Sequence, residues 1–202
     1  MIEAAREGAC LTLTLNRPEK ANALTREMLV SLTDAVGTAG RDDTCKVVVL
    51  TGAGKVFSAG ADLDAARAGL ATDPVWELLS GAVAALPCLT IAALNGTAAG
   101  GSLGMVLACD LRVAVPEAKL FYPVMKLGFL PQPSDPVRLR ALVGPARAKL
   151  ILMGGAKVTA DEALTMGLVD RVTPDVLGQA QALAGNALAA ERGHVQAIKR
   201  MV

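Results

Sequence analysis

The chain has 202 residues, which suits one globular domain with a sizeable core. Hydrophobic residues make up 52% of it and aromatic residues only 2%, so we expect a core of alanine, leucine and valine. The formal net charge is +1 with no basic block, which argues against nucleic acid as a partner. The four cysteines form no C-x-x-C pair and there is one histidine, so we expect free thiols and no metal site.

Two segments bear on targeting and membranes. Residues 1–9 carry three charges and no apolar core, so no signal peptide is predicted. Residues 78–109 carry no charge, which by length alone is typical of a membrane span. Pro87, Asn95-Gly96 and Gly100-Gly101 divide this stretch into a helix end, a strand, a turn and a helix. We therefore expect a cytoplasmic protein with no membrane partner.

The first half of the chain alternates predicted strands with predicted helices. Thr25 and Asp73 have the side chains of helix N-caps, and Pro74 suits the first helical position. The run at 46–50, which is β-branched or apolar after Lys46, indicates a strand buried on both faces. In chain order, we expect a strand at 10–15, a helix from Thr25 to about Ala39, a strand at 46–50, a helix from Asp73 to about Leu86 and a strand at 89–94.

The second half continues the alternation. Thr159 and Glu162 form a capping box, and Gly167 suits the position just after the helix end. In chain order, we expect a helix at 100–108, strands at 111–115 and 119–121, a helix from Pro145 to about Met153, the capped helix, a strand at 168–172 and helices at 174–190 and 194–201. Strands that alternate with helices predict an α/β fold.

Two glycine-bearing segments each follow a strand-like run, at 51–63 and at 95–101. Each can present a free backbone N–H at the end of its strand, and two such donors aimed at one point make an oxyanion hole. Either segment alone is better explained as a tight strand–helix turn. A phosphate-binding loop is not expected because the chain has no G-x-x-x-x-G-K-[ST] run. The pair predicts chemistry on a carbonyl group but identifies no acid or base.

Five motifs in order resemble the enoyl-CoA hydratase/isomerase (crotonase) family. They are Leu15 to Leu24 (LNRPEKANAL), Phe57 to Asp62 (FSAGAD), Asn95-Gly96 through Gly100-Gly101, Cys109-Asp110, and Gly155 to Leu168. The resemblance covers nearly the whole chain. It implies an α/β fold, a crotonase-like ββα spiral with C-terminal helices.

The resemblance also implies an organisation and an assembly. Residues 1–145 would form the spiral core that binds acyl-CoA, and residues 146–202 a C-terminal helical region shortened relative to the family. Family members assemble as homotrimers or dimers of trimers, so the same assembly is expected. No cofactor would be held permanently, since coenzyme A enters as part of the thioester substrate.

By the same resemblance, the backbone N–H groups of Ala61 and Gly101 are the oxyanion donors. They would stabilise the enolate formed when a proton leaves the carbon next to a thioester. The residues expected to contact the acyl-CoA are Asn22, Ala23, Ala59, Ala61, Asp62, Leu63, Asp64 and Gly100.

The carboxylates that the family's hydratases use are replaced. The two glutamate positions correspond to Gly104 and Val124, and a third position where some isomerases carry an aspartate corresponds to Gln132. Water addition needs two carboxylates as general acid and base, so ordinary hydratase activity is not expected. Asp135 is the remaining candidate base, although a residue before Pro136 also suits a helix start. Tyr122 either orients a substrate group or packs in the core.

Two functions follow from these residues. The first is an isomerase or decarboxylase-like lyase of fatty acid metabolism that acts through an oxyanion-stabilised enolate. Decarboxylation fits because it needs the oxyanion hole but no strong base. The second is a non-catalytic acyl-CoA-binding or assembly subunit that has lost the acids.

Overall fold

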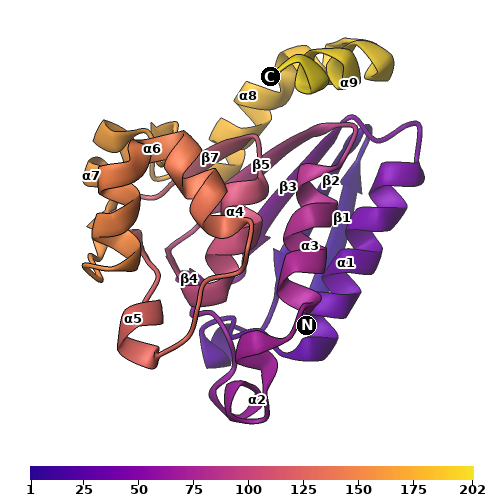
Figure 1. Ribbon diagram of the computed structural model, residues 1–202. Coiled ribbons are helices and arrows are strands. Elements are labelled where there is room, and N and C mark those ends of the chain that lie inside the picture. Colours follow the sequence, from indigo (N-terminus) through magenta and orange to yellow (C-terminus); the bar gives the residue numbers. More distant parts are fainter.

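A large sheet of six strands organises the chain, and the computed structural model describes residues 1–202 (Figure 1). Its strand order is β1-β2-β3-β5-β7-β10, and only the β1–β2 pair is antiparallel. The strands are β1 (Ile2–Glu7), β2 (Cys10–Leu15), β3 (Val47–Gly52), β5 (Leu89–Leu94), β7 (Leu111–Ala114) and β10 (Arg171–Val172).

A smaller sheet has the order β4-β6-β8-β9. Its strands are β4 (Val56–Ser58), β6 (Thr97–Ala99), β8 (Lys119–Phe121) and β9 (Val158–Thr159). Each of its first three strands directly follows a long strand of the large sheet, and helices follow each short strand. This threefold repeat of long strand, short strand and helix confirms the α/β fold and the ββα spiral expected from the sequence.

Helices cover both faces of the large sheet. The longer ones are α1 (Arg26–Arg41), α3 (Val75–Ala84), α6 (Asp135–Leu152), α8 (Val176–Ala189) and α9 (Arg192–Met201); the shorter ones are α2 (Leu63–Arg67), α4 (Leu103–Ala108), α5 (Val124–Leu127) and α7 (Ala160–Met166). One apolar cluster joins the sheet to α1, α3 and α4, and a second joins its other face to α8. Figure 1 shows α1 and α3 beside the sheet and α8 behind it. Along β3, Val48 and Leu50 belong to the first cluster and Val47 and Val49 to the second, which is why this strand is apolar from Val47 to Leu50.

The predicted helix caps are present. Thr25 accepts a hydrogen bond from the Met28 N–H at 3.3 Å, and the capping box of Thr159 and Glu162 is complete. Gly167 ends α7 in the left-handed conformation, with φ 80°. These local signals fixed helix ends because they satisfy backbone groups that have no partner inside the helix.

The structure differs from the expected elements in three places. Helix α6 spans Asp135–Leu152, but Gly144, with φ 78° and ψ 167°, interrupts it, so its second part begins at the predicted Pro145 and its first part, from Asp135, was not predicted as a helix. Strand β1 was not predicted, since its charged residues are exposed at the sheet edge and give no buried period. The strand predicted at 168–172 shortens to β10, because Leu168 and Val169 pack in the turn after α7.

The division at residue 145 stays a prediction. Strands β9 and β10 both follow it, yet they pair with β8 and β7. No helix of the chain combines the length and the apolar run needed to cross a membrane.

Candidate active site

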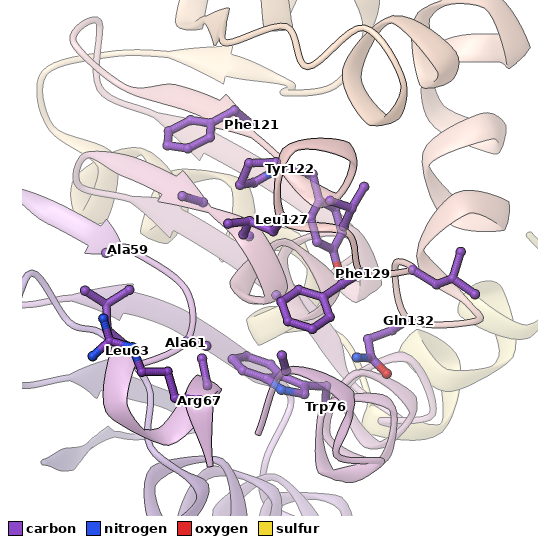
Figure 2. Close-up of a pocket in the computed structure, with 18 residues that line it drawn as sticks. Ala59, Ala61, Leu63, Arg67, Trp76, Phe121, Tyr122, Leu127, Phe129 and Gln132 are labelled. Carbon is purple, nitrogen blue, oxygen red and sulfur yellow. The ribbon is translucent and has the colours of Figure 1, made fainter. Parts of the chain in front are cut away.

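A cavity of about 340 Å³ lies where the two glycine-bearing segments meet the loop after β8 (Figure 2). Thirteen of its 18 lining residues are hydrophobic, so it suits an apolar group held by few polar contacts. The lining residues are Ala59, Ala61, Leu63, Ala66, Arg67, Ala71, Trp76, Ala99, Gly100, Gly101, Phe121, Tyr122, Pro123, Val124, Leu127, Phe129, Leu130 and Gln132.

The two glycine-bearing segments touch backbone to backbone. Gly60 has φ +91°, and a Cβ built on it would lie 2.7 Å from the Ala99 carbonyl oxygen and 3.5 Å from the Gly100 Cα. Gly100 has φ +59°, which also favours glycine. Ala61 and Gly101, the next residues of each segment, therefore enter the same cavity from two strands.

The Ala61 N–H is free because of a single-residue bridge to Leu24. The Leu24 N–H donates to the Gly60 carbonyl at 2.8 Å, and the Asp62 N–H donates to the Leu24 carbonyl at 2.9 Å. These bonds flank Ala61 and use neither of its own backbone groups. The Ala61 N–H makes no hydrogen bond within the chain.

Gly101 is the second residue of a 3-10 turn at Gly100–Ser102, which continues into α4. N–H groups in the first turn of a helix have no partner within the helix. A Cβ on Gly101 would lie 3.1 Å from the Trp76 ring, so Gly101 also packs closely against that ring. Trp76 is fixed in turn by donating from its Nε1 to the Leu70 carbonyl at 2.8 Å.

Hydrogen bonds from the side chains of Ser58 and Asn22 hold the backbone that leads to Gly60 in place. Ser58 Oγ accepts from the Gly60 N–H at 3.1 Å and donates to the Asn22 carbonyl at 2.8 Å. The Asn22 side chain is fully buried and donates to the carbonyls of Ala53 and Val56, at 2.9 and 2.7 Å. Asn22 and its neighbour Ala23 do not line the cavity. The Asn22 side chain is therefore committed to shaping the loop, and the contact of Asn22 and Ala23 with coenzyme A stays a prediction.

Residues 62–64 fall into three environments. Asp62 caps α2 and pairs with Arg17 at 2.7 Å, and this hydrogen bond holds the pKa of Asp62 below its usual range. Leu63 lines the cavity, together with the predicted Ala59 and Gly100. The Asp64 side chain is 93% exposed and pairs with Arg67 at 3.2 Å. Arg67 is the one cation in the cavity lining.

No carboxylate lines the cavity. Val124 and Gln132, at two of the positions where the resemblance implies acids, are lining residues, while Gly104 is buried in α4. No group of three acidic, cysteine or histidine side chains gathers as a metal site.

Asp135 lies behind the cavity wall. It is fully buried, does not line the cavity, and accepts a hydrogen bond at Oδ2 from the Tyr122 hydroxyl at 2.9 Å. Burial raises the pKa of Asp135 to about 6, and burial also raises the pKa of Tyr122. A Cβ on Gly104 would lie 3.1 Å from Asp135 Oδ1, so the carboxylate occupies the space that a side chain at 104 would take.

Several lining residues were not predicted from the sequence. Trp76 packs against Gly101, and Leu127, Phe129 and Leu130 line the cavity from α5 and the loop after it. Trp76 is the chain's only tryptophan, which was the one available signal. The pairing of Gly104 with Asp135 joins positions 31 residues apart, and no local pattern reports such a contact.

Comparisons with known proteins agree on one family. The family model described as enoyl-CoA hydratase/isomerase matches residues 5–202. Bacillus subtilis YngF is 42% identical over 181 residues, which cover 85% of this chain and 69% of that protein. The crotonyl-CoA hydratase of Syntrophomonas wolfei is 34% identical over 91% of this chain and 74% of its own length.

The solved structures give the same result for the fold. The enoyl-CoA hydratase/isomerase of Pseudoalteromonas atlantica superposes with a TM-score of 0.92 at 31% identity, covering 99% of this chain and 81% of that one. The enoyl-CoA hydratase of Bacillus anthracis has a TM-score of 0.91 at 32% identity, covering 98% of this chain and 81% of that one.

Proposed function

The chain belongs to the enoyl-CoA hydratase/isomerase family, and we propose that it binds an acyl-CoA thioester and stabilises the thioester's enolate. The carbonyl oxygen sits between the N–H groups of Ala61 and Gly101. The observation that carries this proposal is the backbone contact at Gly60 and Gly100, which brings both residues to one apolar cavity.

The donors suit an enolate better than a ground-state ester. Removing the α proton moves a full negative charge onto the thioester oxygen, and fixed donors strengthen their hydrogen bonds as that charge develops. A donor of this kind typically contributes about 10²- to 10³-fold in rate. The apolar lining excludes water and so raises the effect of both N–H groups.

The reaction is more isomerase- or lyase-like than hydratase-like. Adding water to a double bond needs one group to activate the water and another to manage the α proton. The cavity wall holds no carboxylate for either task. Decarboxylation of an acyl-CoA makes the enolate without removing a proton, so the two N–H groups alone serve it.

The rest of the substrate lies toward α2. Ala59, Leu63 and Gly100 line the cavity there, and Asp62 fixes the start of the helix. We place coenzyme A along Ala61 to Asp64, with its adenine end toward Asn22 and Ala23. Coenzyme A is then part of the substrate, and no resident cofactor or metal is needed. The proposal includes a cytoplasmic homotrimer or dimer of trimers.

One observation favours a second function. A wall without carboxylates is also what a non-catalytic acyl-CoA-binding or assembly subunit would have. In that case the N–H pair holds the thioester without turnover.

One experiment separates the two functions. The protein is mixed in D₂O with butyryl-CoA, with crotonyl-CoA and with a malonyl-type thioester. Binding is measured by calorimetry, and each ester is followed by NMR. Deuterium at the α carbon or a shifted double bond supports the enolate enzyme, and a malonyl-type thioester that loses carbon dioxide supports the lyase. Binding without either reaction supports the second function, and absence of binding contradicts both.

A further inference from the structure

One carboxylate oxygen in the protein core lacks a hydrogen-bond partner. Asp135 begins α6 and is fully buried, yet its Oδ1 accepts no hydrogen bond. Buried polar atoms are almost always paired, because an unpaired one costs its hydration without compensation. Packing alone therefore does not explain an acidic side chain at this place.

The fold makes room for this carboxylate. A Cβ on Gly104 would lie 3.1 Å from Oδ1 and 3.3 Å from Oδ2 of Asp135. Glycine weakens a helix relative to alanine, and Gly104 is a buried position within α4. The space left at Gly104 is what allows Asp135 to reach its position from α6.

Tyr122 connects Asp135 to the cavity. Its hydroxyl donates to Asp135 Oδ2 at 2.9 Å, while Tyr122 itself lines the cavity and Asp135 does not (Figure 2). Tyr122 and Arg67 are the only ionisable residues in the cavity lining. Of the two, only Tyr122 is neutral, and its hydroxyl can donate one proton while its oxygen accepts another.

On the premise of the proposed function, we propose that Tyr122 and Asp135 form a proton relay. Tyr122 receives the α proton of the bound acyl-CoA and passes its own hydroxyl proton to Asp135.

The step balances in protons and charge. The substrate Cα–H bond breaks and a new O–H bond forms at Tyr122 Oη, while the original Oη–H bond breaks and its proton bonds to Asp135 Oδ2. The electron pair of the C–H bond enters the enolate, whose charge rests at the N–H groups of Ala61 and Gly101. Tyr122 stays neutral, and the negative charge moves from Asp135 to the enolate. Return of the proton to the same carbon exchanges the α hydrogen, and return to the γ carbon of an unsaturated ester shifts its double bond.

The charges around Asp135 come from two helices. Arg138 of α6 favours the carboxylate form, and Glu77 of α3, which is hydrogen-bonded to Ser134, disfavours it. Burial is the largest influence and raises the pKa of Asp135 to about 6. Above that pH Asp135 is an ionised base, and it is a stronger base than an exposed aspartate.

The test compares α-hydrogen exchange of butyryl-CoA in D₂O between pH 5 and pH 8. The proteins are the wild type, Tyr122→Phe, Asp135→Asn and, as a matched control, Asp34→Asn at an exposed position of α1. We expect the wild-type rate to rise with pH and level off above about 6. We expect each relay variant to lose about 10²-fold or more of the rate, with unchanged binding of butyryl-CoA, because a positioned general base contributes about that much. The control keeps the wild-type rate and profile.

Each outcome bears on one proposal in particular. Exchange that persists in Tyr122→Phe or Asp135→Asn overturns the relay and leaves the proposed function standing. A wild type that binds butyryl-CoA without exchanging its α hydrogens also overturns the relay, and it leaves the binding function. A wild type that binds no acyl-CoA overturns the proposed function itself. Tyr122→Phe removes a single oxygen atom, so it carries the test if Asp135→Asn does not fold.

Discussion

The two sides of the cavity differ in whether backbone or side-chain groups form them. One side consists of backbone: the glycine-bearing segments at Gly60–Ala61 and Gly100–Gly101, which touch each other directly. The other side consists of side chains from the loop after β8 and from α5, with Asp135 behind them. The backbone side keeps the features that the family resemblance implies, whereas the acids implied on the side-chain side are absent. A backbone donor survives most substitutions, while an acid disappears with a single one.

The backbone side should be the more sensitive to a change that removes a donor. Gly101→Pro deletes the N–H, and Gly101→Ala keeps it while adding the same Cβ against the Trp76 ring. We expect α-hydrogen exchange of butyryl-CoA to fall about 10²- to 10³-fold more in the proline variant than in the alanine variant. Equal rates in the two variants would show that packing against Trp76, and not the N–H, is what matters.

The turn at Gly96, which lies in the second glycine-bearing segment, should be destabilised by an added methyl group. A Cβ on Gly96 would lie 2.1 Å from the Lys55 carbonyl oxygen, whereas nothing lies within 4 Å of a Cβ on Gly185 in α8. We expect Gly96→Ala to lower the free energy of unfolding by about 2 to 4 kcal/mol. Gly185→Ala should raise it by about 0.5 to 1 kcal/mol, because alanine favours a helix. Urea unfolding of both variants checks this, and a Gly96→Ala protein as stable as the wild type contradicts the described turn.

On the side-chain side, the ionised carboxylate of Asp135 should lower the free energy of unfolding. The pKa of Asp135 is raised from 3.8 to about 6 by folding, so the folded state binds the proton more tightly than the unfolded state. Stability therefore falls as the pH rises from about 4 to about 6 and is lowest above that range. We expect Asp135→Asn to be more stable than the wild type at pH 8 by on the order of 2 to 3 kcal/mol, and by less at pH 5.

Urea unfolding at the two pH values measures that difference. Asp34→Asn, at an exposed position, should change little at either pH. An Asp135→Asn protein that is less stable than the wild type at pH 8 would show that the ionised carboxylate is well satisfied in the fold.

A smaller effect is expected from filling the space beside that carboxylate. The methyl group of Gly104→Ala would lie 3.1 Å from Asp135 Oδ1, so the carboxylate or α4 must shift slightly. We expect exchange to fall about tenfold and stability to change by about 1 to 2 kcal/mol or less, because overpacking opposes the better helix propensity of alanine. Binding of butyryl-CoA should be unchanged. If Gly104→Ala exchanges the α hydrogens as fast as the wild type does, Asp135 takes no part in the reaction.

The sequence allowed much of the backbone side to be predicted. Apolar runs and turn residues are local signals, and they led to β3, β5 and the two glycine-bearing segments, while the family resemblance singled out Ala61 and Gly101 within those segments. The first part of α6 was missed apart from the possible helix start at Asp135, and the edge strand β1 was missed because it has no buried period. On the side-chain side, the missing acids and the two candidates Tyr122 and Asp135 could be named from the sequence, but their contact could not. The contact of Tyr122 with Asp135 depends on how α6 packs against α4, which no spacing in the sequence records.

The proposed role of the Ala61 and Gly101 N–H groups can be observed on the bound thioester itself. In NMR of butyryl-CoA labelled with ¹³C at the thioester carbonyl, the carbonyl resonance moves downfield when its oxygen accepts stronger hydrogen bonds. We expect a downfield shift on binding to the wild type and to Gly101→Ala, and a clearly smaller shift with Gly101→Pro. A bound ester whose carbonyl resonates where it does in water, or a shift that the proline variant leaves intact, would rule out the two N–H groups as the oxyanion donors.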